Sequence, residues 1–158
     1  MYALRILLAT AAAATVGFAF HVLYGRGLAQ DYLAAAGESG RLGHMLQEPY
    51  PTYVVTIAAL TALIPTLGKV IVWLLVRDKL PSVTTAGKAL WFTGLMMLIG
   101  GDFLRMPIMN LLVGMPIDVW AVYSAEQWVI VPMMCFLIVF ILPPSRDVHP
   151  GSMQTAQA

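Results

Sequence analysis

Residues 119–142 read VWAVYSAEQWVIVPMMCFLIVFIL, a stretch in which Glu126 is the only charged side chain. A hydrocarbon core about 30 Å thick requires about 20 apolar residues in a helix that rises 1.5 Å per residue. The stretch is therefore long enough to cross a bilayer. It ends at Pro143 and Pro144, where two adjacent prolines cannot continue a helix. These features predict a transmembrane helix.

Three further stretches have the same length and character, at about 4–24, 53–76 and 89–113. Helices are favoured over strands because every backbone N–H and C=O in hydrocarbon must be paired within its own segment. A transmembrane barrel would instead show alternating segments of about ten residues. We therefore predict an all-α integral membrane protein, a four-transmembrane-helix bundle that forms a single domain over residues 1–145.

The composition agrees with this class and excludes others. Hydrophobic residues make up 59% of the chain and charged residues 11%, whereas about 25% of residues are charged in soluble domains. The net charge of +1 gives no electrostatic reason to expect nucleic acid as a partner, and the expected partner is the lipid bilayer. A single cysteine, Cys135, rules out an internal disulfide. No motif indicates a metal or another cofactor, and none is predicted.

The connection from Gly25 to Thr52 is the one long loop between the predicted spans. Apolar residues recur in it at helical spacing, which predicts short helices lying on the outer membrane surface. The tail over residues 146–158 lacks such spacing, and we expect it to be disordered in the cytoplasm.

The short loops carry an asymmetric distribution of basic residues. Four spans place both termini and the central loop on one side, and basic residues concentrate on the cytoplasmic side of membrane proteins. The terminal side holds Arg5, Arg77, Lys79, Lys88 and Arg146, and the other side holds Arg26 and Arg41. We therefore expect both termini in the cytoplasm, with the protein in a bacterial inner membrane.

Ionisable side chains inside the predicted spans are the candidate functional residues. Each costs at least about 2.5–3.5 kcal/mol at a bilayer centre, so such a residue is a functional-site hypothesis by default. The candidates for a ligand or ion pocket, including nearby polar residues, are His21, Lys69, Asp102, Arg105, Asn110, Glu126 and Gln127. For Lys69 an alternative role is an interfacial anchor, because a lysine stem can reach toward the membrane surface.

Arg105 and Glu126 are expected at similar depth, because spans three and four are antiparallel and are joined by a short turn. We therefore predict a salt bridge between them. Asp102 lies three residues before Arg105, on the same helix face. As an alternative to a ligand-binding role, the Asp102–Arg105 pair could be purely structural: the two charges would neutralise each other and fix helix packing.

Three functional hypotheses follow from these residues. The first is a small multi-pass protein with an intramembrane polar pocket for a small ligand, ion or transported solute. Transport by so few helices would favour a homodimer. The second hypothesis is an accessory subunit of a larger membrane complex, which requires Arg105 to point away from the bundle. The third is an enzyme that acts on a lipid-soluble substrate, which requires Asp102, Arg105 and Glu126 to converge. No catalytic residue is assigned, and the sequence does not decide whether the protein is an enzyme.

Overall fold

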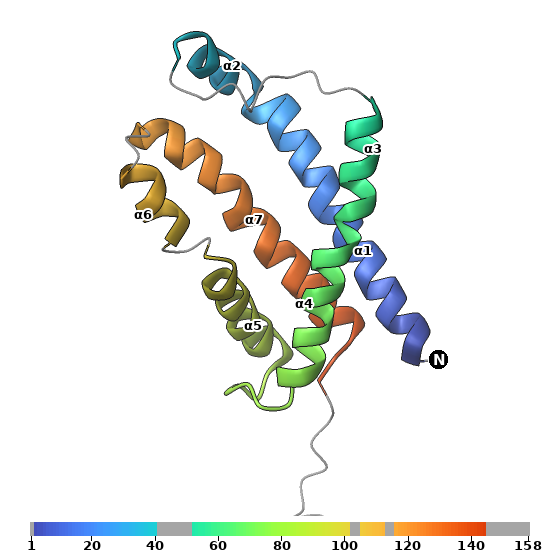
Figure 1. Ribbon diagram of the computed structural model, residues 1–158. Coiled ribbons are helices and arrows are strands. Elements are labelled where there is room, and N and C mark those ends of the chain that lie inside the picture. The colour runs from blue at the N-terminus through green and yellow to red at the C-terminus, as the bar shows by residue number, and fades with distance from the viewer. Residues whose placement is uncertain (1, 41–51, 102–104, 113–115, 145–158) are drawn as a thin grey trace, which may run out of the picture.

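The computed structural model describes residues 2–40, 52–101, 105–112 and 116–144. Within these ranges every regular element is a helix, so the prediction of an all-α protein is confirmed for this part of the chain. In chain order the elements are α1 (Tyr2–Leu23), the π-helix η1 (Tyr24–Leu28), α2 (Gln30–Glu38), α3 (Thr52–Thr61), α4 (Leu63–Val76), α5 (Thr85–Gly100), α6 (Arg105–Leu112) and α7 (Ile117–Ile141) (Figure 1).

Three helical segments are long and apolar enough to cross a membrane. They are Tyr2–Gly27, Val55–Val76 and Ile117–Ile141, with 26, 22 and 25 residues. They coincide with the first, second and fourth predicted spans. The structure therefore supports a membrane-embedded, helical protein.

The third predicted span, 89–113, is two helices rather than one. Helix α5 ends at Gly100, and α6 begins at Arg105. Gly101 adopts a φ of +76°, and its N–H donates to the Leu98 carbonyl at 3.2 Å. Residues with a side chain rarely adopt this left-handed conformation, and glycine commonly ends helices in this way. The apolar pattern continues past Gly101, which is why the sequence predicts one uninterrupted helix there.

The second span is interrupted at Ala62, between α3 and α4. Pro65 explains this break, because a proline lacks an N–H and its ring clashes with the carbonyl four residues earlier, here that of Thr61. The next backbone bond, from Thr66 N–H to the Ala62 carbonyl, is stretched to 3.4 Å. The span is therefore bent at the place where the proline weakens its hydrogen bonding.

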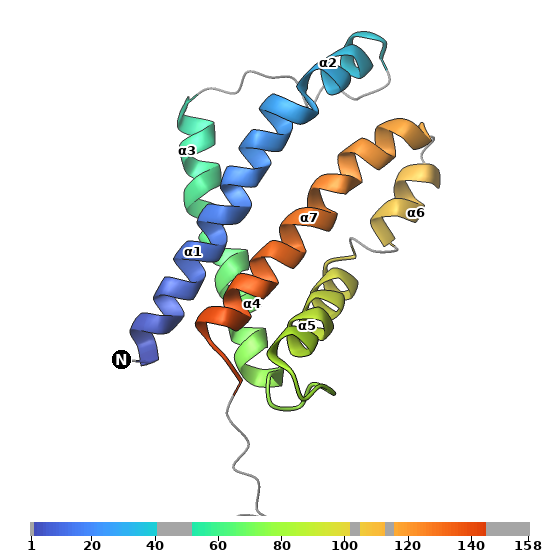
Figure 2. The ribbon, with the colours of Figure 1, turned by 180° about the vertical axis from the view of Figure 1, so that it is seen from behind.

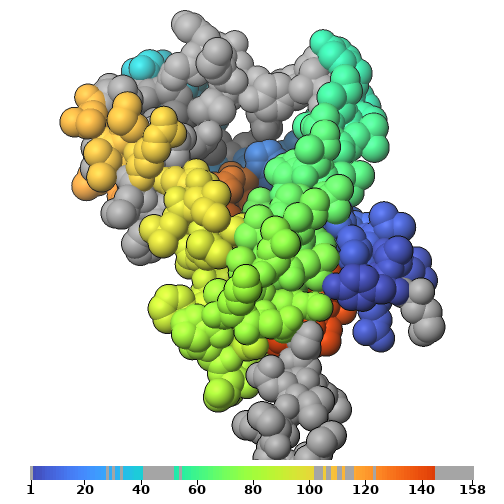
Figure 3. Space-filling model, turned by 60° about the horizontal axis from the view of Figure 1, so that its bottom comes forward, coloured from blue at the N-terminus to red at the C-terminus, as the bar shows by residue number. Residues whose placement is uncertain are grey.

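Helix α7 lies at the centre of the bundle. Helices α1 and α5 pack against it, and α4 packs against α1 and the last turns of α7 (Figures 1 and 2). The start of α1, the α4–α5 connection and the end of α7 lie at one end, which we call the basic end. Helix α2, η1 and the start of α7 lie at the opposite end, the α2 end. In the space-filling view, α3 and α4 form a ridge between α1 and the α5–α6 side (Figure 3).

The α1–α7 interface depends on small residues of α1. Ala9 and Ala13 are completely buried, and Gly17 faces Met134. A Cβ added at Gly17 would lie 2.8 Å from the Met134 sulfur, closer than real Cβ contacts allow. Small residues let membrane helices approach each other closely, and at Gly17 that approach leaves no room for a side chain.

Trp73 joins α4, α5 and α7 at the basic end. Its side chain is fully buried, its ring centroid lies 5.2 Å from that of Phe92, and its indole N–H donates to the Leu142 carbonyl at 2.7 Å. Leu142 directly follows α7, where carbonyls lack partners within the helix. One side chain thus fills the core and caps the end of the central helix.

Two short helical elements, η1 and α2, lie in the predicted 25–52 loop. The part of that loop at 41–51, where a second short helix is predicted, lies outside the described residues, as does the tail over 146–158.

Candidate functional site

Two of the predicted site residues meet across the α1–α7 interface. His21, in the last turn of α1, is hydrogen-bonded through Nδ1 to a carboxylate oxygen of Glu126 in α7. The Glu126 side chain is 12% exposed and the His21 side chain 61% exposed. The carboxylate is therefore largely enclosed by protein, while the imidazole that pairs with it is open to the surroundings.

The pair belongs to a row of polar contacts along one face of α7. Asp118, Val122 and Glu126 are four residues apart, so they lie one above the other on the helix. The Tyr24 hydroxyl donates to the Val122 carbonyl at 2.6 Å, and the Tyr32 hydroxyl donates to the Asp118 carboxylate. Ring side chains from α1, η1 and α2 therefore contact successive turns of α7. We call this row the α7 polar stripe, consisting of positions 118, 122 and 126.

The π-helix η1 brings Tyr24 to the stripe. The Ala29 N–H donates to the Tyr24 carbonyl at 2.9 Å, which spans the five residues of a π-type bond. The Tyr24 ring also stacks on Phe20, with 5.9 Å between the ring centroids. Short π-helical turns inside or at the end of α-helices occur frequently at functional sites. The wider turn and the stacking fix where the hydroxyl group lies.

Toward the basic end the same face of α7 becomes apolar. Ile130, Met134 and Ile138 continue the four-residue spacing, and all three are buried. The polar contacts are therefore confined to the α2 end, above a packed apolar interface. Because water is excluded from such packing, the site opens toward the α2 end or toward the side of the bundle.

The predicted salt bridge between Arg105 and Glu126 is wrong. Among the residues that the structure describes, Arg105 forms no ion pair, and Glu126 is engaged by His21. Arg105 is exposed at the start of α6. The reason is the break at Gly101, since extrapolating a straight helix from α5 does not give the position of a residue in α6.

Lys69 lies apart from the pair. It is half-buried in α4, next to the fully buried Val70. Among the described residues, no hydrogen bond or ion pair joins Lys69 to His21 or Glu126. Lys69 therefore belongs to the packing of α4 rather than to the polar stripe.

In the described part of the structure, the remaining predicted site residues do not form a pocket with the His21–Glu126 pair. Gln127 is exposed on α7, Asp102 lies outside the described residues, and Asn110 is in α6 with its side chain outside the description. Within the described part of the chain, no group of three or more His, Cys, Asp or Glu residues could hold a metal ion.

Tyr24, Tyr32 and Asp118 are not among the site residues predicted from the sequence. The missed signal was the regular spacing of positions 118, 122 and 126, which places two carboxylates on one face of α7. The two tyrosines that complete the contacts belong to η1 and α2, and their positions do not follow from the spacing of any single helix.

These features define the class of the protein: a helical protein with three helices of membrane-spanning length and an ionisable pair between the first and the last of them. The chain matches no known family, no curated protein and no solved structure. Its function must therefore be argued from its own residues.

Proposed function

We propose that this is a small multi-pass transport protein of a bacterial inner membrane, which binds and releases a proton at the His21–Glu126 pair. The observation that carries the proposal is the contact between an enclosed carboxylate and an open imidazole across two spanning helices. Asp, Glu and His residues inside membrane spans characteristically form proton relays in pumps and transporters.

The exposures of the two groups support a proton as the bound species. Imidazole exchanges a proton near neutral pH, and the His21 side chain is open to the surroundings. Glu126 is enclosed, and a charged carboxylate in apolar surroundings is costly without a partner. A proton that arrives at His21 would therefore be held by the hydrogen bond between the two side chains. On the imidazole it forms an imidazolium whose charge balances that of the Glu126 carboxylate, and on the carboxylate it gives a neutral acid beside a neutral imidazole.

The proposed topology has four crossings with both termini in the cytoplasm. The third crossing would consist of α5 followed by α6. Helix α5 alone, with 16 residues, is about 24 Å long, shorter than the hydrocarbon core of about 30 Å. Helices broken within the membrane occur in transporters, where they line binding sites. Because four helices enclose little space, we propose that the transporting unit is a dimer.

The test is proton flux into liposomes. The purified protein is reconstituted with a pH-sensitive dye inside, and a potassium diffusion potential drives protons inward. We expect Glu126→Gln to lower the flux at least about a hundredfold, the low end of what a positioned proton-transfer group contributes. Asp118→Asn is the matched control, because Asp118 lies on the same stripe but is exposed and bound by Tyr32; it should retain most of the flux.

Two results would reject the proposal: wild-type flux no faster than in protein-free liposomes, or equal flux in the wild-type protein and Glu126→Gln. Circular dichroism and thermal unfolding in detergent establish that both variants are folded. If Glu126→Gln is folded, its loss of flux cannot be attributed to loss of structure.

A second candidate function, an accessory subunit or a homodimer without transport, is favoured by the exposure of Arg105. An arginine side chain that faces lipid is costly, and a contact with another chain would remove it from lipid. Light scattering of the protein in mild detergent gives its mass. A dimer that Arg105→Gln dissociates would support this role if the wild-type protein also shows no proton flux, and a monomeric wild-type protein would exclude the homodimer.

The enzyme hypothesis requires Asp102, Arg105 and Glu126 to converge. No contact between Arg105 and Glu126 is present in the described residues, and Asp102 lies outside them. No observation therefore favours catalysis over the two proposals above.

A further inference from the structure

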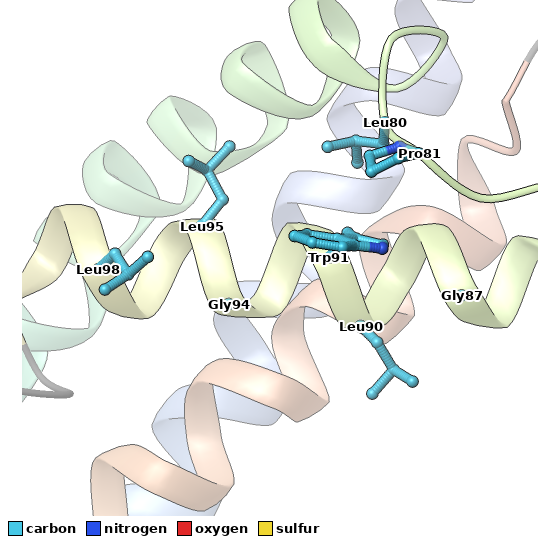
Figure 4. Close-up of a pocket in the computed structure, with 8 residues that line it drawn as sticks. All are labelled: Leu80, Pro81, Gly87, Leu90, Trp91, Gly94, Leu95 and Leu98. Carbon is cyan, nitrogen blue, oxygen red and sulfur yellow. The ribbon is translucent and has the colours of Figure 1, made fainter.

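A groove runs along the face of α5 that points away from α7. It has a volume of about 630 Å³ and is lined by apolar side chains and glycines (Figure 4). Leu80 and Pro81, from the α4–α5 connection, cover the end of the groove beside Trp91. Leu95 and Leu98 line it further along the helix. The groove lies in the α5 half of the molecule, away from the α1–α7 site.

The groove has the length of one membrane leaflet. It extends along α5 from Gly87 to Leu98, eleven residues or about 16 Å. Half of a hydrocarbon core about 30 Å thick is about 15 Å. The groove starts in the first turn of α5, at the basic end, and therefore fits an extended acyl chain of a lipid in the leaflet at that end.

A glycine forms the hollow part of this face. Gly94 is exposed, and a Cβ added there would meet no atom within 4 Å. Its neighbours on this face, Leu90, Trp91 and Leu98, are 62%, 56% and 61% exposed. The depression thus results from a missing side chain between three large ones, and it is not filled by the protein itself.

One exposed basic side chain, that of Lys79, lies next to the mouth of the groove, whereas Lys88 in the first turn of α5 is buried. Lys79 is exposed and directly precedes the lining residues Leu80 and Pro81. In the described part of the basic end the only acidic residue is Asp78, whose carboxylate lies 3.6 Å from Arg77 Nε. The basic residues described at this end are Arg5, Arg77, Lys79 and Lys88.

The first turn of α5 adds to this attraction for anions. The Thr84 side chain caps the helix by accepting from the Gly87 N–H at 3.0 Å. The N-terminus of a helix carries a partial positive charge and attracts phosphate groups. An anion at the mouth of the groove would therefore meet both this helix end and the side chain of Lys79.

We propose that this groove binds one acyl chain of an anionic glycerophospholipid, with the lipid phosphate between Lys79 and the first turn of α5. Any lipid can lie against an apolar helix, so selectivity must come from the charged mouth. Basic clusters beside spanning helices attract anionic headgroups on the cytoplasmic side of membranes. The lipid would fill the hollow at Gly94 and hold the α4–α5 connection against α5.

The position of Trp91 in the groove provides the test. Phosphatidylglycerol with brominated acyl chains is titrated into the protein in detergent, and brominated phosphatidylcholine with the same chains is titrated in parallel. Bromine quenches tryptophan emission at short range, and the difference between the wild-type protein and Trp91→Phe isolates the Trp91 signal. We expect phosphatidylglycerol to quench Trp91 at a lower mole fraction than phosphatidylcholine does.

Two variants test the two parts of the groove. Lys79→Gln should lower the preference for phosphatidylglycerol about fivefold, the effect of one basic residue near a membrane surface. Gly94→Leu should weaken the quenching by both lipids, because it fills the hollow that receives their acyl chain. Gly68→Leu is the matched control, because Gly68 in α4 is also exposed with no atom within 4 Å of an added Cβ and does not line the groove.

Equal quenching by the two lipids would overturn the proposal, as would an unchanged preference in Lys79→Gln or wild-type quenching by both lipids in Gly94→Leu. The Lys79→Gln arm requires no change inside a helix, so it remains decisive if Gly94→Leu folds poorly. None of these outcomes depends on proton flux through the His21–Glu126 pair.

Discussion

Glu126 is, among the described residues, the only acidic side chain that is not exposed. Its hydrogen bond to His21 joins residues 105 positions apart in the chain. Hydrogen bonds to charged groups contribute about 1.5–3 kcal/mol, and a buried charged group left without a partner is costly. The pair therefore both fixes the α1–α7 interface and keeps an ionisable carboxylate within the membrane-spanning part of the protein.

Trp73→Phe tests the hydrogen bond from the Trp73 indole in α4 to the Leu142 carbonyl at the end of α7. Phenylalanine keeps an aromatic ring beside Phe92 but leaves the Leu142 carbonyl without its indole donor. We expect a loss of about 1–3 kcal/mol in the free energy of unfolding, measured by denaturant titration in mixed micelles. Trp91→Phe, at an exposed tryptophan of α5, is the control; equal stability of the two variants would contradict this role.

At the scale of the elements, close approach of α1 to α7 brings His21 within reach of Glu126. That approach depends on the small residues of α1, above all on Gly17 beside Met134. The polar contacts lie one turn beyond Gly17, toward the α2 end. A change in the spacing of the two helices is therefore transmitted directly to the hydrogen-bonded pair.

Gly17→Leu should destabilise the bundle and separate the pair. A leucine side chain at this position would overlap Met134, and overpacking typically costs about 1–3 kcal/mol. The measurements are thermal unfolding in detergent and proton flux in liposomes, with Gly68→Leu as the control in open space. Wild-type stability and flux in Gly17→Leu would show that the helices are not held together at this point.

At the scale of the whole molecule, the α4–α5 connection and the start of α7 lie at opposite ends (Figure 1). The described helices that connect these ends along the chain are α5 and α6. If the protein lies across a bilayer, the broken third span must cross it although it is not one continuous helix.

Labelling of single cysteines tests this crossing. In a Cys135→Ala background, Val83→Cys and Ile117→Cys place thiols at two exposed sites, 102% and 67% exposed. We expect a membrane-impermeant maleimide to label position 117 in intact cells and position 83 only after permeabilisation. Labelling of both positions from the same side would show that α5 and α6 do not cross the membrane.

The sequence predicts the helical class and three spans because apolar length is a property of each segment alone. The break at Gly101 was missed because it depends on the φ angle of one residue inside a continuing apolar run. Glu126 could be identified because a charge in a span is costly whatever its partner. The partner of Glu126 could not be identified in this way, because the choice between His21 and Arg105 depends on how α1 and α6 are placed against α7.

The most direct test of the central claim is a double-mutant cycle on proton flux with His21→Gln, Glu126→Gln and the double variant. Residues that act as one unit are not additive. If the pair is the proton site, each single variant should lose about as much flux as the double variant. Losses that multiply in the double variant, or full flux in any of the three, would contradict the claim that His21 and Glu126 form one functional site.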